Sequence, residues 1–374
     1  MKDYRRKLHK PDYKFLIAIF LIIIFGLVML SSASVSMSYE KFGEAYYYLK
    51  HQFLFGILGG IVLFVFFTIL DYRLLRRIAF PLLIFSIALL LLVFIPGIGA
   101  EYGTAKSWIY ILGISFQPAE LVKLTFLIYL ASWLESRGKK KAGDFSEGLV
   151  PFLTVLGVIA ALLILQPDIG TMSIIILVSL VVYFVGGANL LHLLGVGFAG
   201  IVSLFLLIKA SPYRTERLMT FLHPELDPQG IGYHINQAFL AIGSGGFWGR
   251  GLGMSRKKFH YLPEVAGDSI FAVIAEELGF IICTLAVIAF LYLMYRGFKI
   301  AQKAPDNFAK LLVIGIVSWI IIQAFVNIGA MVGLLPLTGV PLPFISYGGT
   351  SMAILLGACG IITNISRQTR GSLS

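Results

Sequence analysis

Residues 212–279 determine how this chain is organised, and they read PYRTERLMTFLHPELDPQGIGYHINQAFLAIGSGGFWGRGLGMSRKKFHYLPEVAGDSIFAVIAEELG. The stretch is polar and rich in glycine and arginine, within a chain that is otherwise almost wholly apolar. It ends where a new hydrophobic helix is expected, and Asp268 is a lone acid at that junction. We therefore expect a membrane-embedded body that carries one large polar loop.

The composition excludes an ordinary soluble domain. The 374 residues are 58% hydrophobic and 13% charged, whereas soluble domains carry about 25% charged residues. The mean hydropathy of +0.88 agrees with an integral membrane protein. Because the apolar runs are long and do not alternate, they predict helices and not a β-barrel. The expected fold class is therefore an all-α polytopic membrane protein.

The apolar runs predict about ten membrane spans of roughly 17–25 residues. Residues 1–374 would form a single membrane domain, with tails at 1–14 and 367–374 and a large loop at 210–268 between the seventh and eighth spans. The predicted spans are 15–34, 51–70, 79–96, 118–136, 149–166, 168–186, 189–209, 269–295, 310–332 and 346–366.

The basic residues predict the orientation of these spans. The segments expected inside carry 19 Lys and Arg residues, whereas the short loops expected outside carry three. By the positive-inside rule, both termini are then cytoplasmic and the large loop is extracytoplasmic. The large loop, together with Lys209 just before it, holds seven further basic residues, which an anionic ligand would explain.

Several other function classes find no support in the sequence. The net charge of +11 reflects the positive-inside bias, since no basic stripe with interleaved aromatic residues suggests binding to nucleic acid. Cys283 and Cys359 fall in apolar segments, and the six histidines form no HExxH set. We therefore expect no disulfide and no histidine-based metal site.

Charged residues inside predicted spans are costly and are usually paired. Glu120 and Lys123 are three residues apart, on one face of a helix. They form either a structural ion pair or the polar lining of a cavity open to the outer leaflet. Glu276 and Glu277 lie in the eighth span, and at least one of them should face a polar interior.

Lys106, Ser107 and Trp108 precede the apolar run 109–112. Aromatic residues beside a cation suit a helix that lies along the outer membrane surface. Such a helix would either anchor the protein or contact a lipid headgroup.

The large loop offers three candidate phosphate ligands, Arg214, Arg217 and Arg250. A solvated loop face is the alternative for each. The glycines at 243–253 either permit close approach to a ligand or mark sharp turns. They match neither a Walker A loop nor a dinucleotide-binding fingerprint.

Asp268 lies where the aqueous loop meets the eighth span. The helix dipole favours its charged form and burial favours its neutral form, so it is a candidate general base. A simple helix cap is the alternative. Residues 336–351 contain three prolines and include Ser346 and Tyr347, which predicts a rigid re-entrant turn facing the large loop.

Taken together, these motifs resemble the SEDS family (shape, elongation, division and sporulation). The resemblance covers nearly the whole chain. It rests on these stretches: Tyr213–Leu218, Asp227–Tyr233, Gly243–Gly246, Gly251–Gly253, Tyr261–Glu264, Phe271–Gly279 and Pro341–Gly349.

This resemblance implies a peptidoglycan glycosyltransferase of the bacterial inner membrane. Such an enzyme polymerises lipid II, an undecaprenyl-pyrophosphate disaccharide-pentapeptide, on the outer face. It works beside a class B penicillin-binding protein and, in division, beside other division membrane proteins. No organic cofactor is expected, and a divalent cation, Mg²⁺ or Mn²⁺, is a candidate with Asp268 as one candidate ligand.

The family's essential aspartate corresponds to Asp268, which is therefore the expected catalytic residue. Many members read His-Thr-Asp-Phe where this chain reads Ala266-Gly267-Asp268-Ser269, so no role carries over for that His or Thr. The expected substrate-binding residues are Arg214, Arg217, Arg250, Lys106, Trp108, Glu120, Lys123, Ser346 and Tyr347.

The segments 335–340 and 364–367 resemble the division-type FtsW branch more than the elongation-type RodA branch. We therefore expect septal synthesis, with RodA-like elongation as the alternative. Two readings from other classes stay open: a lipid II transporter, and a non-catalytic scaffold that recruits the crosslinking partner.

Overall fold

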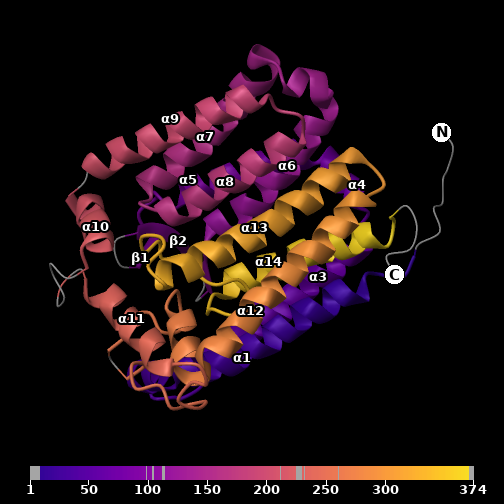
Figure 1. The fold of residues 1–374 in the computed structure, drawn as a ribbon. Helices are drawn as coiled ribbons and strands as arrows, with labels where there is room; N and C mark the ends of the chain where they lie inside the picture. Colours follow the sequence, from indigo (N-terminus) through magenta and orange to yellow (C-terminus); the bar gives the residue numbers. More distant parts are fainter. Residues whose placement is uncertain are drawn as a thin grey trace.

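The computed structural model describes residues 9–97, 99–102, 105–111, 114–210, 212–224, 230, 232–259 and 261–369. They form a bundle of long helices that run side by side (Figure 1). The helices are α1 Tyr13–Phe42, α2 Tyr47–His51, η1 Gln52–Leu58, α3 Gly59–Ile69, α4 Tyr72–Arg77, α5 Ala79–Leu92, α6 Pro118–Ala142, η2 Phe145–Leu149, α7 Val150–Leu165, α8 Ile169–Val185, α9 Leu190–Lys209, α10 Pro212–Leu222, α11 Tyr233–Gly245, α12 Ile270–Gln302, α13 Asn307–Met331 and α14 Gly349–Ser366.

Each predicted span coincides with a helix or with consecutive helical segments. Seven of the described helical stretches are long and apolar enough to cross a membrane. Two more apolar helices are shorter, namely α5 with 14 residues and α8 with 17. The helical membrane fold is thus confirmed.

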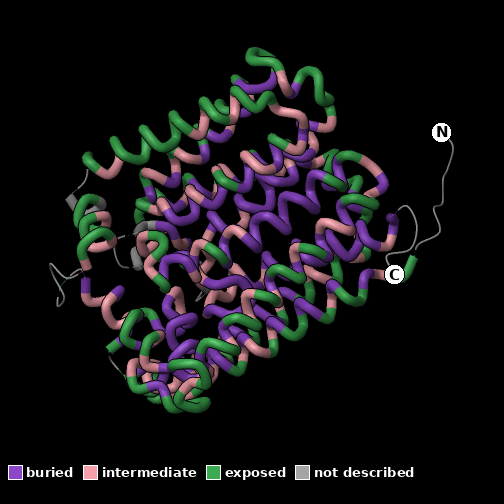
Figure 2. The backbone as a smooth tube through the Cα atoms, in the orientation of Figure 1, coloured by how far each residue is buried: buried purple, intermediate pink, exposed green. Residues whose placement is uncertain are grey.

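Helices α13 and α14 form the centre of the bundle. Most side chains of α13 and α14 are buried, whereas no residue of α9 is. Figure 2 shows the buried residues concentrated on the central helices and the exposed ones along the outer helices. An apolar helix that is buried all round belongs to the core, and an apolar helix exposed all round is covered by lipid.

The prediction of a helix along the membrane surface after Lys106 is wrong. Residues Ala105–Ile111 form strand β2, which pairs antiparallel with β1 (Gly99–Tyr102) and with β3 (Ile114–Phe116). Aromatic and β-branched residues favour a strand here. Ser107 and Ile109 are buried and Tyr110 is exposed, as the two-residue period of a strand requires.

The polar stretch 210–268 between the seventh and eighth predicted spans carries helices of its own. It contains α10 and, after residues outside the described part, α11. Ile235, Ala238 and Ala241 recur at helical spacing along α11 and are buried where α11 packs against α12. The amphipathic pattern of 233–245 is what makes this segment helical.

Helix α12 is two helices joined at a break. Gly279 has φ 75° and ψ −176°, which no residue inside an α-helix adopts. Residues 270–277 before the break are all buried, and 280–302 after it is the part long enough to cross a bilayer. The span predicted at 269–295 overlaps α12, and its first residues form a short buried helix that Asp268 precedes.

The break exists because two backbone segments meet there. A Cβ on Gly279 would lie 2.3 Å from the backbone N of Gly249, and one on Gly249 would lie 2.3 Å from the carbonyl oxygen of Glu277. The backbone N–H of Arg250 donates to the carbonyl of Glu276 at 3.0 Å. The glycine run thus approaches the α12 backbone, so close packing within the protein explains these glycines.

Replacing Gly279 with Ala should destabilise the protein, because the side chain would clash with Gly249 and would force a positive φ. Positive φ at a non-glycine residue costs about 1–3 kcal/mol before any clash. Thermal unfolding in detergent measures the effect. Gly195→Ala is the control, since Gly195 lies in α9 with nothing near its Cβ position. Equal melting temperatures for the two variants would contradict this account.

Candidate functional site

Asp268 lies on a tightly held turn immediately before α12. Its side chain is half-buried, and its backbone carbonyl accepts a hydrogen bond from Asn327 Nδ2 at 2.8 Å. Ser269, not Asp268, is the N-cap residue of α12, and no side chain caps this helix. The helix-cap alternative for Asp268 is therefore wrong, because its carboxyl group does not cap α12.

The surroundings of Asp268 bring the pKa of its carboxyl group close to neutral pH. Burial, helped by the nearby charge of Glu264, raises the pKa of Asp268 to about 7. A hydrogen bond from Ser269 and the charge of Arg217 oppose this rise. A carboxyl group with a pKa near the working pH suits a general base, because it is both available and basic.

His234 of α11 reaches the same turn. Its Nε2 lies 2.6 Å from Ser269 Oγ, and Ser269 Oγ donates to Asp268 Oδ1 at 3.4 Å. Burial, together with Arg217, lowers the pKa of His234 to about 4. The imidazole is therefore neutral at pH 7, and Ser269 connects it to the Asp268 carboxyl group.

The proline-rich turn between α13 and α14 meets the Asp268 turn, as predicted. Ser346 Oγ donates to the carbonyl of Gly267 at 2.7 Å, and Tyr347 N donates to the carbonyl of Ala266 at 2.7 Å. Tyr347 Oη lies 3.0 Å from His51 Nδ1. The structure thus brings Ser346 and Tyr347 next to the catalytic candidate, and both bind the backbone of the two residues that precede Asp268.

Glu120 and Lys123 form a buried ion pair in α6, with 2.7 Å between Lys123 Nζ and Glu120 Oε1. Lys123 Nζ also donates to Gln323 Oε1 at 2.8 Å, and Gln323 Nε2 donates to the carbonyl of Pro341 at 2.9 Å. The void beside Lys123 measures only about 10 Å³. The structural ion-pair reading is therefore correct for the described residues, and substrate contact by this pair stays a prediction.

Glu276 and Glu277 anchor residues 246–259, which we call the glycine-rich loop. Glu277 accepts from Lys258 Nζ at 2.8 Å and from Ser32 Oγ at 2.7 Å. Glu276 accepts from Ser255 Oγ at 2.6 Å. Both acids face a polar interior, which confirms the prediction for them.

The predicted cationic and aromatic ligands are dispersed. Arg217 is exposed on α10 and influences Asp268. Arg250 Nε donates to the carbonyl of Ser244 at the end of α11 at 3.2 Å, and it lies 3.9 Å from Glu276 Oε1. Trp108 is half-buried in β2. The side chains of Arg214 and Lys106 lie outside the described part of the structure.

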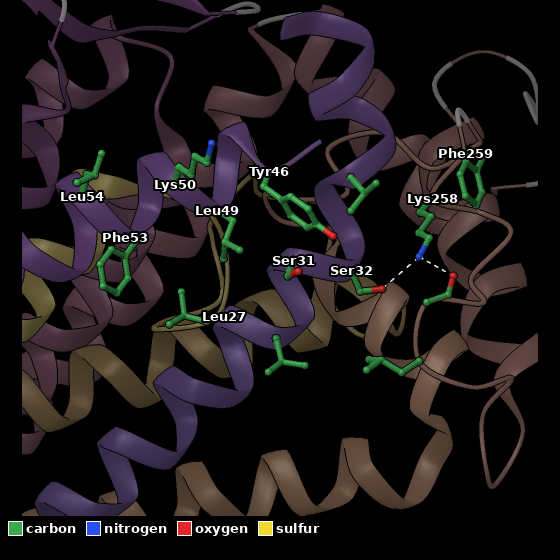
Figure 3. Close-up of a pocket in the computed structure, with 14 residues that line it drawn as sticks. Leu27, Ser31, Ser32, Tyr46, Leu49, Lys50, Phe53, Leu54, Lys258 and Phe259 are labelled. Atoms are coloured by element: carbon green, nitrogen blue, oxygen red, sulfur yellow. Dashed lines mark hydrogen bonds between the residues drawn. The ribbon is translucent and has the colours of Figure 1, made fainter. Parts of the chain in front are cut away.

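A groove of about 1000 Å³ opens between α1, the α2–η1 segment and the glycine-rich loop. Its wall is mainly apolar, and Lys258 bonds to Ser32 at its edge (Figure 3). An apolar groove with a polar edge suits a hydrocarbon chain with a polar head. It is lined by Leu27, Val28, Ser31, Ser32, Val35, Tyr46, Leu49, Lys50, Phe53, Leu54, Leu252, Gly253, Lys258 and Phe259.

A metal site is not visible among the described residues, where no three His, Cys, Asp or Glu side chains lie close enough together to hold an ion. Asp268 has no such companions there. We therefore derive no chemical step through a divalent cation, and the requirement for Mg²⁺ or Mn²⁺ stays a prediction.

The sequence reasoning missed four residues around the site. Gln323 and Asn327 lie four apart in an apolar span, and buried amides at that depth are a signal we could have used. Ser269 and His234 gave no such signal, because they are 35 positions apart and ordinary in a polar segment.

Comparison with known proteins gives the family. The model of the cell cycle protein family that covers FtsW, RodA and SpoVE matches residues 13–371. The chain belongs to this family. Two relatives of the FtsW/RodA/SpoVE family match almost end to end. Stage V sporulation protein E of Bacillus subtilis is 39% identical over 96% of this chain and 98% of its own. The probable peptidoglycan glycosyltransferase FtsW of Geobacter sp. strain M18 is 38% identical over 98% of this chain and 100% of its own.

Solved structures of the FtsW/RodA/SpoVE family share the fold. A chain from work on "structural coordination of polymerization and crosslinking by a peptidoglycan synthase complex" has a TM-score of 0.77 and 28% identity, covering 96% of this chain and 98% of that one. The rod shape determining protein RodA of Thermus thermophilus has a TM-score of 0.71 and 28% identity, covering 97% and 98%.

Replacing Lys258 with Met should leave Glu277 as an uncompensated buried charge, which costs about 3–5 kcal/mol. The double variant Lys258→Met, Glu277→Gln should recover part of the loss. Lys50→Met is the matched control, because the Lys50–Glu44 pair lies exposed at the same groove and such pairs contribute about 0–1 kcal/mol. Thermal unfolding in detergent measures all three, and a Lys258→Met variant as stable as Lys50→Met would refute the anchor.

Proposed function

We propose that this chain is a peptidoglycan glycosyltransferase that polymerises lipid II on the outer face of the bacterial inner membrane. The observation that carries the proposal is Asp268, a carboxyl group with a pKa of about 7 on a turn fixed by Asn327, Ser346 and Tyr347. Relatives of matching length are named as probable peptidoglycan glycosyltransferases, which supports the assignment.

In the proposed reaction the donor is a growing glycan on undecaprenyl pyrophosphate. The sugar 4-hydroxyl of an incoming lipid II attacks the anomeric carbon of the donor, and the bond from that carbon to pyrophosphate breaks. Asp268 takes the proton of the attacking hydroxyl, and such help contributes about 10²–10⁴-fold. Arg217, whose charge reaches Asp268, stabilises the departing diphosphate.

The groove beside Lys258 supports a lipid substrate. Its walls come from α1 and η1, which belong to membrane-spanning stretches. A polyprenyl chain can lie against these apolar walls while its diphosphate stays at the polar end of the bundle. We propose this groove for the lipid tail of one of the two substrates.

We propose an FtsW-like role in septal synthesis, beside a class B penicillin-binding protein and other division proteins, with both termini of the chain cytoplasmic. The similar chain from a peptidoglycan synthase complex supports pairing with a crosslinking enzyme. Complementation in bacteria distinguishes an FtsW-like role from a RodA-like role. The chain should restore growth after depletion of FtsW and not after depletion of RodA. Rescue of only the RodA-depleted strain would replace the septal role with elongation.

Replacing Asp268 with Asn should abolish glycan synthesis from purified lipid II while leaving the protein folded. The amide has nearly the same shape but cannot accept the proton. Gel analysis of glycan products measures the activity, with and without the class B protein and Mg²⁺ or EDTA. A transporter would make no glycan even as wild type, and a scaffold would tolerate Asp268→Asn in cells. Near-normal product from the variant would remove Asp268 from the mechanism.

The rate should rise with pH through about 7, because the base works in its ionised form and Asp268 ionises above its pKa. At pH 6 the rate should be about one tenth of that at pH 8. Because the charge of Glu264 helps to raise the pKa of Asp268, Glu264→Gln should move the acidic limb to lower pH. A pH–rate profile measures both, and an unmoved limb in Glu264→Gln would argue against Asp268 as the titrating base.

A further inference from the structure

The glycine-rich loop displays large apolar side chains that nothing in the described structure covers. We call Phe247, Trp248, Leu252, Met254 and Phe259 the apolar rim, and all five are exposed. Trp248 is the extreme case, with 83% of its surface accessible. Several exposed large apolar residues on one short segment mark a surface that meets something apolar.

The rim is held rigidly, so its exposure is a fixed property of the fold. Glu277 accepts from the backbone N–H of Gly253 at 3.0 Å, and Glu276 accepts from that of Arg256 at 3.1 Å. The backbone N–H of Gly251 donates to the carbonyl of Glu277 at 2.9 Å. A loop anchored at this many points cannot fold its aromatic residues back against the protein.

One end of the rim is continuous with the membrane-spanning surface of α12. The ring of Phe247 packs edge to face against Phe280, with 6.0 Å between centroids. Phe280 is the first residue after the break at Gly279, where the spanning part of α12 begins, and it too is exposed. Phe247 therefore lies at the level where α12 enters the bilayer.

The other end of the rim meets α1. Leu252 and Phe259 line the groove together with Leu27 and Val28 of that helix. Helix α1 is itself long and apolar enough to cross the membrane. The rim is thus bounded on both sides by surfaces that face lipid.

The charges of the segment fit the phosphate layer of a membrane. Residues 246–263 contain Arg250, Arg256, Lys257 and Lys258 and no acidic residue. Lys258 is neutralised by Glu277, whereas Arg256 is exposed. Aromatic side chains beside basic ones are typical of segments at the level of lipid headgroups.

We infer that the loop 247–259 is seated in the bilayer interface, with the apolar rim in the upper acyl region and Arg256 at the lipid phosphates. The loop is therefore a membrane-bound element and not an aqueous one. This inference is independent of the glycosyltransferase assignment, because it concerns only the surface that meets lipid.

Fluorescence quenching of Trp248 tests the inference in the full chain reconstituted in nanodiscs. The part of the signal lost in Trp248→Phe isolates this residue, and Trp133→Phe is the control for a tryptophan on α6. Lipids brominated near the headgroup end of the acyl chain should quench Trp248 at least twofold more than lipids brominated near the methyl end. Aqueous acrylamide should quench it weakly.

Strong quenching by acrylamide with none by brominated lipids would overturn the inference. Shielding of Trp248 from acrylamide only after a partner protein is added would also overturn it, and would assign the rim to that partner. The phosphate contact has its own test: anionic brominated lipids should quench Trp248 more than zwitterionic ones, and Arg256→Gln should abolish the difference. Equal quenching in the wild type would remove Arg256 from the interface.

Discussion

The contact on which the rest of this structure depends is the approach of the glycine run to the break in α12. Two backbones meet where Gly249 faces Gly279, at a distance that no side chain permits. The buried side chains of Glu276 and Glu277 then bind Ser255 and Lys258 of the glycine-rich loop. This single junction shortens the spanning part of α12, buries the helix that follows Asp268, and fixes the surface that the loop shows to its surroundings.

The site is built from backbone carbonyls as much as from side chains. Asn327 binds the carbonyls of Asp268 and Val340, and Ser346 binds that of Gly267. Two turns from distant parts of the chain are thus joined to α13. The carboxyl group of Asp268 takes no part in these bonds. A base that must change protonation in each cycle benefits from supports that do not titrate.

Much of this could be predicted from the sequence because the strongest signals are long apolar runs and isolated charges. The helices follow from the long apolar runs, since a backbone in lipid must form its own hydrogen bonds. The polar setting of Glu276 and Glu277 follows from the cost of charge in lipid. A hydropathy window averages over about 19 residues, so it could not register a break at the single residue Gly279. The strand 105–111 was missed because aromatic residues beside a cation suit a surface helix as well. The approach of His234 to Ser269 depends on tertiary folding alone.

Helix α13 is tied to its neighbours by polar bonds at two levels, through Gln323 and through Asn327, while α9 buries no side chain at all. Sliding α13 by one turn would break these bonds inside the bundle. Shifting α9 would disturb only partly buried contacts, such as those of Leu193 and Val196 with the core. Helix α13 is thus fixed in register within the bundle, whereas α9 is the helix that can be displaced at lower cost.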